Sequence, residues 1–96
     1  MRLTFALAAR LDLIAIGDYI AQDSPARADS FVEELMACCW RLVEAPEAYP
    51  VVYPRRNIRR RPFGAYNIFY VCRAEDVLIL HVLNAAQDAG RILRRN

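Results

Sequence analysis

Arginine is concentrated in the middle of this chain of 96 residues. Five arginines fall within seven positions, namely Arg55, Arg56, Arg59, Arg60 and Arg61. Such a cluster repels itself and requires a compensating anion, and the planar guanidinium group suits a carboxylate or a phosphate. We therefore expect this stretch to bind an acidic partner; the alternative is a solvated edge strand whose charges prevent aggregation. In a strand, Arg59 and Arg61 would share a face and Arg60 would point away.

His81 is the only histidine in the sequence. The two-residue alternation of a strand places it on the same face as Val77, Ile79 and Leu83. A general base needs an orienting carboxylate and a substrate within reach. The sequence identifies neither, so a hydrogen-bonded structural histidine is favoured over a catalytic one. Tyr70 is likewise interpreted as a core residue whose hydroxyl finds a partner at the sheet edge.

No recognisable set of metal ligands is present. One histidine, without an HExxH motif or a CxxC pair, does not make a zinc site, and we expect neither a metal nor a cofactor. Cys38, Cys39 and Cys72 are interpreted as reduced core thiols. Apolar residues make up 56% of the chain, yet no apolar run approaches the ~18 residues that a membrane span requires. We expect a cytoplasmic globular protein.

Charge divides the chain into two halves. Residues 1 to 50 carry four Arg against eight Asp and Glu, a net charge of −4, whereas residues 51 to 96 carry nine Arg against three, a net charge of +6. The basic half should face an acidic partner. Composition alone does not distinguish a protein carboxylate from a nucleic-acid phosphate as that partner.

The spacing of apolar residues predicts the order of the secondary-structure elements. They are, in order, a strand (1–5), a helix (6–22), a second helix (25 to 44 or 45), a proline-rich crossover, three strands (57–61, 66–73 and 77–83) and room for a short helix within 85–96. The first helix has an apolar line of Ala9, Leu13, Ile16 and Ile20. In the strand at 66–73, one face alternates with the other: Tyr66, Ile68, Tyr70 and Cys72 against Asn67, Phe69, Val71 and Arg73. Ser24 caps the second helix and Pro25 occupies its first position, so the helices form an antiparallel hairpin. Pro62 ends the strand at 57–61, which is predicted to be an edge strand. We predict a single domain, residues 1–96, of class α+β, with the hairpin packed on a small, mainly antiparallel sheet.

Several of these residues, in this order, resemble the RelE/ParE superfamily of toxin–antitoxin toxins, and in particular its ParE branch. In the helical half they are Ala9, Asp12-Leu13, Ile16, Asp18-Tyr19-Ile20, Ser24-Pro25-Ala26, Phe31 and Leu35. In the sheet half they are Arg60 or Arg61, Gly64, Tyr66, Ile68-Phe69-Tyr70, Val77-Leu78-Ile79-Leu80 and Val82-Leu83. The chain departs from the family pattern at Asn84 and Gln87, where members commonly carry His and Arg, and it keeps Asp88.

The resemblance implies a toxin of a type II toxin–antitoxin system, with roles in growth arrest and plasmid stabilisation. Because Asn84 and Gln87 cannot exchange a proton near neutral pH, the resemblance favours the ParE branch, which implies inhibition of DNA gyrase by binding. It also implies a ParD-like antitoxin with an acidic C-terminal segment, a hetero-oligomer of two toxins per antitoxin dimer or a multiple, and contact with DNA only through the antitoxin. Two alternatives stay open: a ribosome-dependent mRNA endonuclease of the RelE type, and an inactive binding remnant.

Three sets of site residues follow from these readings. Contacts with the antitoxin are predicted at Arg10, Asp18, Arg59 and Arg61. Contacts with the target are predicted at the C-terminal exit, at Asn84, Gln87, Asp88, Arg91 and Arg94. In the endonuclease alternative, the catalytic cleft would be lined by Arg59, Arg61, Tyr70 and His81.

Overall fold

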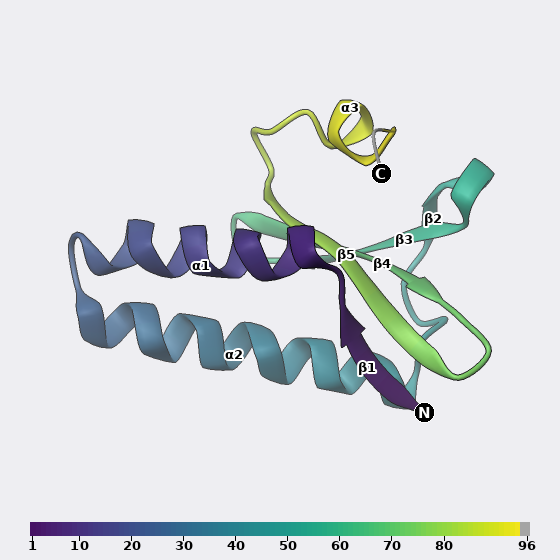
Figure 1. Cartoon of the computed structure of the whole chain (residues 1–96), viewed down its shortest axis with the longest axis horizontal. Coiled ribbons are helices and arrows are strands. Elements are labelled where there is room, and N and C mark those ends of the chain that lie inside the picture. The colour runs from purple at the N-terminus through teal and green to yellow at the C-terminus, as the bar shows by residue number, and fades with distance from the viewer. Residues whose placement is uncertain (95–96) are drawn as a thin grey trace.

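A five-stranded sheet forms the centre of the protein (Figure 1). The computed structural model describes residues 1–94. Its elements are β1 (Arg2–Phe5), α1 (Leu7–Ala21), α2 (Pro25–Glu44), β2 (Val51–Tyr53), the 3-10 helix η1 (Pro54–Arg56), β3 (Ile58–Phe63), β4 (Tyr66–Cys72), β5 (Asp76–Asn84) and α3 (Ala89–Arg94). The strand order is β1-β5-β4-β3-β2. β1 runs parallel to β5, and all the other neighbours are antiparallel. The predicted α+β class is confirmed.

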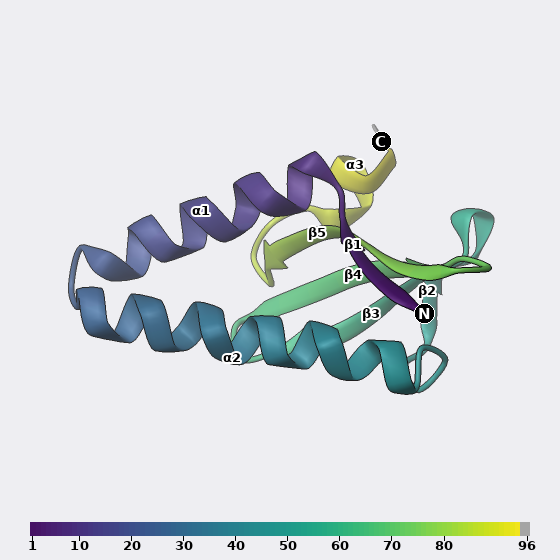
Figure 2. The same ribbon diagram turned by 60° about the horizontal axis from the view of Figure 1, so that its bottom comes forward.

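The sheet is covered on both faces (Figure 2). The α1–α2 hairpin packs on one face through a cluster that includes Leu35, Ile68 and Tyr70. The short helix α3 packs on the opposite face through Leu93, in a cluster with Ile58 of β3, Phe69 of β4, and Leu80 and Leu83 of β5. The alternation predicted for β4 is therefore confirmed. A short C-terminal helix is also present, although residues 95 and 96 of the predicted range lie outside the described residues.

Local signals at the hairpin act as the sequence predicts. The Ser24 hydroxyl accepts a hydrogen bond from the Arg27 backbone N–H at 3.2 Å, and Pro25 begins α2. On α1, Ala9 and Ile16 are buried, which matches the predicted apolar line. No helix within residues 1–94 combines the length and the apolar character that crossing a membrane requires.

The strand containing the arginines differs from the prediction in two ways. β3 is not the edge of the sheet, because β2 pairs with its first half, Val51 opposite Arg59. Pro62 does not end β3 but lies inside it, opposite Asn67 of β4. The outer hydrogen bonds of β3 reach Arg60, whose N–H donates to the carbonyl of Pro50. Beyond that point β3 is an edge, where proline removes no donor that the sheet needs.

A β-bulge in β5 corrects the predicted facing of its side chains. Phe69 of β4 pairs with His81 and the next residue, Tyr70, pairs with Ile79. Leu80 is therefore an extra residue, and the two-residue alternation is interrupted there. As a result Leu83 packs on the α3 side of the sheet, whereas Ile79 packs on the hairpin side. The prediction that Leu83 shares a face with Val77 and Ile79 is wrong for this reason.

Candidate functional site

His81 lies against the first helix and is hydrogen-bonded to it. The Asp12 Oδ2 atom on α1 is 2.8 Å from His81 Nδ1 and accepts a second hydrogen bond, of 2.9 Å, from the Val82 backbone N–H. β1 ends at Phe5, opposite Ile79, so beyond it the Asp12 carboxylate takes the place of a strand partner for β5. Sequence reasoning missed this carboxylate because 69 positions separate it from the histidine. The hydrogen-bonded histidine that we expected is confirmed.

Tyr70 and Arg59 are brought together on neighbouring strands and hold the connection between α2 and β2. The fully buried Tyr70 donates its hydroxyl proton to the Pro46 carbonyl at 2.8 Å, as the sequence led us to expect. Burial, followed by the nearby Cys72 thiol, raises the pKa of Tyr70 to about 12. Arg59 donates to the carbonyls of Tyr49 at 2.6 Å and Glu47 at 3.3 Å. Both side chains therefore bind main-chain oxygens of this connection.

Arg61 lies on the same face of β3 as Arg59. Its guanidinium carbon is 5.3 Å from the centre of the Tyr49 ring and 6.0 Å from that of Phe63, both of which pack against the hairpin-side core. Arg60 is exposed. The four residues of the endonuclease alternative do not converge: Arg59 and Tyr70 meet at the α2–β2 connection, whereas His81 is bonded to α1.

The polar residues at the C-terminal exit shape a turn. The Asn84 Oδ1 atom accepts from the Ala86 N–H at 2.9 Å, and the Gln87 Oε1 atom accepts from the Asn84 N–H at 2.8 Å. Asp88 precedes α3 and accepts from the Arg91 N–H at 3.1 Å, as a helix-capping residue does. Asn84, Gln87 and Asp88 thus fix the path from β5 into α3. Their types at this spacing are typical of a turn followed by a helix cap.

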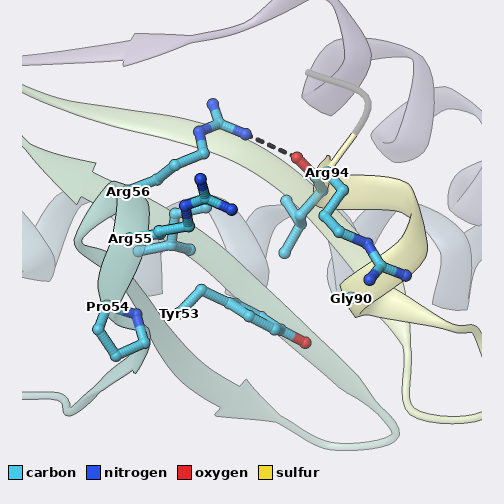
Figure 3. Close-up of a pocket in the computed structure, with 8 residues that line it drawn as sticks. Tyr53, Pro54, Arg55, Arg56, Gly90 and Arg94 are labelled. Atoms are coloured by element: carbon cyan, nitrogen blue, oxygen red, sulfur yellow. Dashed lines mark hydrogen bonds between the residues drawn. The ribbon is translucent and has the colours of Figure 1, made fainter.

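A pocket opens between η1 and α3 (Figure 3). It has a volume of about 560 Å³ and is lined by Tyr53, Pro54, Arg55, Arg56, Ile58, Gly90, Leu93 and Arg94. The Arg56 guanidinium joins its two walls by donating to the Leu93 carbonyl at 2.6 Å. Of the predicted target-binding residues, Arg94 lines this pocket, and Arg91 lies on the same helix outside the lining. Nothing in the sequence pattern placed η1 beside α3.

The outward side of α1 carries a stripe of exposed apolar residues. Leu7, Leu11 and Ile14 are 71%, 57% and 61% exposed. Their spacing of four and three residues places them on one side of the helix, opposite the buried Ala9 and Ile16. A helix that is apolar on both sides normally packs against something on each. The stripe, defined here as these three residues, is therefore a candidate protein-binding surface.

Two of the predicted antitoxin-binding residues flank this stripe. Arg10 is exposed on α1, and Asp18 follows Ile14 by one helical turn. Asp18 and Ile14 also line a groove of about 560 Å³ between α1 and α2. The structure thus groups Arg10 and Asp18 with the stripe, and places Arg59 and Arg61 elsewhere, on β3.

Other chemistry is sparse in the described part of the chain. Within residues 1–94, no group of three or more His, Cys, Asp or Glu side chains is arranged to hold a metal ion. The three cysteines are free thiols. Burial raises the pKa of Cys39 to about 12, so this thiol stays protonated and unreactive near neutral pH.

Comparisons with known proteins agree with this architecture. No functionally curated protein matches the chain. A solved structure described as a chromosomal ParDE toxin–antitoxin system from P. aeruginosa superimposes with a TM-score of 0.76 at 20% identity, covering 88% of this chain and 95% of that one. At this identity the likeness establishes a shared fold. The family model for the ParE toxin of the type II toxin–antitoxin system parDE matches residues 3–89. The chain therefore belongs to the ParE toxin family.

Proposed function

We propose that this ParE toxin inhibits DNA gyrase by binding it, in the cytoplasm, and that a ParD-like antitoxin reverses the inhibition. Membership of the ParE family is the observation that carries the proposal. The surroundings of the candidate acid–base groups support binding over RNA cleavage. Tyr70 has a raised pKa and donates to Pro46. His81 has an orienting carboxylate in Asp12, but it is only 8% exposed, which leaves a substrate little access to its ring.

The apolar stripe on α1 is the proposed binding site of the antitoxin. A flexible segment that folds on binding can lay an apolar helical face along such a stripe. The segment's acidic residues would pair with Arg10 beside the stripe and with Arg61, a partly exposed residue. Arg59 is the weaker candidate, because it already donates to the Glu47 and Tyr49 carbonyls.

The face of the sheet opposite the α1–α2 hairpin, together with α3 and the C-terminal exit, is the proposed binding site of the target. Because the stripe and this face are separate surfaces, the antitoxin can bind the stripe without displacing α3. With one toxin on each half of an antitoxin dimer, the assembly would contain two toxins per dimer or a multiple, and it would reach DNA through the antitoxin. Growth arrest, and stabilisation of a plasmid that carries the pair, are the expected cellular consequences.

A supercoiling assay tests the proposal. Purified toxin is titrated into DNA gyrase with relaxed plasmid and ATP, and antitoxin is then added back. We expect loss of supercoiling, or trapped cleaved DNA, that antitoxin reverses. A parallel reaction with translating ribosomes and mRNA serves as the comparison. Unimpaired gyrase together with mRNA cleavage would replace the proposal by the endonuclease alternative, and inactivity in both assays by well-folded, antitoxin-binding protein would indicate a remnant.

A further inference from the structure

The pocket between η1 and α3 combines an apolar floor with a basic rim. Its floor includes Ile58 and Leu93, which are 1% and 2% exposed, together with the Tyr53 ring. Its rim carries the guanidinium groups of Arg55, Arg56 and Arg94, and Figure 3 shows these arginines on the two facing walls. The volume lies within the range of roughly 300–1,000 Å³ that is typical of ligand-binding pockets.

The charge of the rim has no compensating acidic side chain among the described residues that line the pocket, three of which are arginines. Arg56 donates to the Leu93 carbonyl, which carries only a partial negative charge. The side chains of Arg55 and Arg94 make no hydrogen bond or ion pair in the described portion of the chain. Two guanidinium groups are thus available to an anion, which they can bind through paired N–H donors.

The apolar floor of the pocket restricts which class of anionic partner can bind there. A DNA backbone presents phosphates and sugars, which would meet the rim and leave the apolar floor without a partner. An acidic protein segment satisfies both parts: an apolar side chain fills the floor, and neighbouring carboxylates meet the rim. Aromatic side chains and arginines in well-packed, desolvated pockets are the usual hot spots of protein interfaces.

We propose that this pocket seats an apolar side chain of an acidic segment of the gyrase protein, with its carboxylates held by Arg55 and Arg94. The inference rests on the proposed gyrase function and names the chemistry of the contact. It assigns a role to η1, which lies in the predicted proline-rich crossover. It also explains how α3 can contribute to target binding although Asn84, Gln87 and Asp88 are engaged in their own turn.

The test measures binding of the toxin to the isolated gyrase A and B subunits, each without DNA, alongside inhibition of supercoiling. One variant removes the rim charges, Arg55→Ala with Arg94→Ala. Its matched control removes two exposed arginines away from the pocket, Arg2→Ala on β1 with Arg27→Ala on α2. A second variant, Gly90→Phe, fills the pocket, because a Cβ at Gly90 would start 3.7 Å from the Tyr53 ring. Thermal melting and antitoxin affinity establish that each variant is folded.

We expect wild-type toxin to bind one of the two subunits. Both pocket variants should bind that subunit at least about tenfold more weakly, which is the size of effect that loss of a hot spot has. The affinity of the control variant should stay close to that of wild type. If the arginine variant inhibits gyrase as strongly as wild type, the pocket contact is overturned, whereas the gyrase proposal still holds. Wild type that neither binds nor inhibits gyrase would overturn both. Binding to DNA alone that depends on Arg55 and Arg94 would overturn the protein-segment contact in favour of phosphate. If Gly90→Phe does not fold, the arginine variant decides.

Discussion

Replacing Asp12 by alanine should destabilise the fold far more than its position on a partly exposed helix suggests. The Asp12 carboxylate accepts hydrogen bonds from the Val82 N–H and from His81. Val82 is 2% exposed, so its N–H would lose its partner away from water, at a cost of about 1–3 kcal/mol. Loss of the bond to His81 adds about 1 kcal/mol. The expected total, about 2–4 kcal/mol, is a large part of the roughly 5–15 kcal/mol that holds a typical domain together.

Urea unfolding followed by circular dichroism measures this effect. Asp18→Ala is the matched control, because Asp18 lies on the same helix and is exposed, and its replacement should change the free energy of unfolding by less than about 0.5 kcal/mol. Asp12→Asn should recover part of the loss, since an amide oxygen can still accept from the Val82 N–H. Equal losses for Asp12→Ala and Asp18→Ala would refute the view that Asp12 completes the edge of β5.

Three further outcomes are expected. Leu11→Asp should weaken antitoxin binding, measured by calorimetry, about tenfold or more with little change in melting temperature. The reason is that Leu11 is 57% exposed and would be buried only in the complex. Unchanged affinity would show that the stripe lies outside the interface. Arg61→Glu should weaken antitoxin binding and flatten its dependence on salt, because one attractive charge becomes repulsive; an unaltered salt slope would show that Arg61 lies outside the interface. Hydrogen bonds from Arg73, and then from Thr4, hold the pKa of Asp76 well below its usual range, so the unfolded chain binds the proton more readily. The resulting stability is present above pH ~4 and is lost as the pH falls further. The Asp76→Asn variant should therefore be less stable than wild type at pH 7 and should lose less stability on acidification. Parallel pH profiles of urea unfolding for the two proteins would contradict this.

Features that depend on neighbours along the chain could be predicted from the amino-acid sequence. The apolar line of α1, the Ser24 cap with Pro25, and the alternation of β4 are set by interactions within a few residues, and the structure has them where the pattern predicted. The resemblance to the ParE branch rested on the same local signals in their order, and the family match over residues 3–89 confirms it.

Tertiary structure decided what depends on segments that meet across the fold. The bulge at Leu80, the pairing of β2 with β3, and the place of Pro62 follow from strand register, which the composition of one strand does not specify. Asp12 meets His81 across 69 positions, and Arg56 of η1 reaches Leu93 of α3 across 37. Propensity and periodicity carry information over about one helical turn or one strand, whereas these contacts exist because the packed sheet brings distant backbone together. The pocket between η1 and α3 is for that reason a property of the fold, although every residue that lines it is present in the sequence.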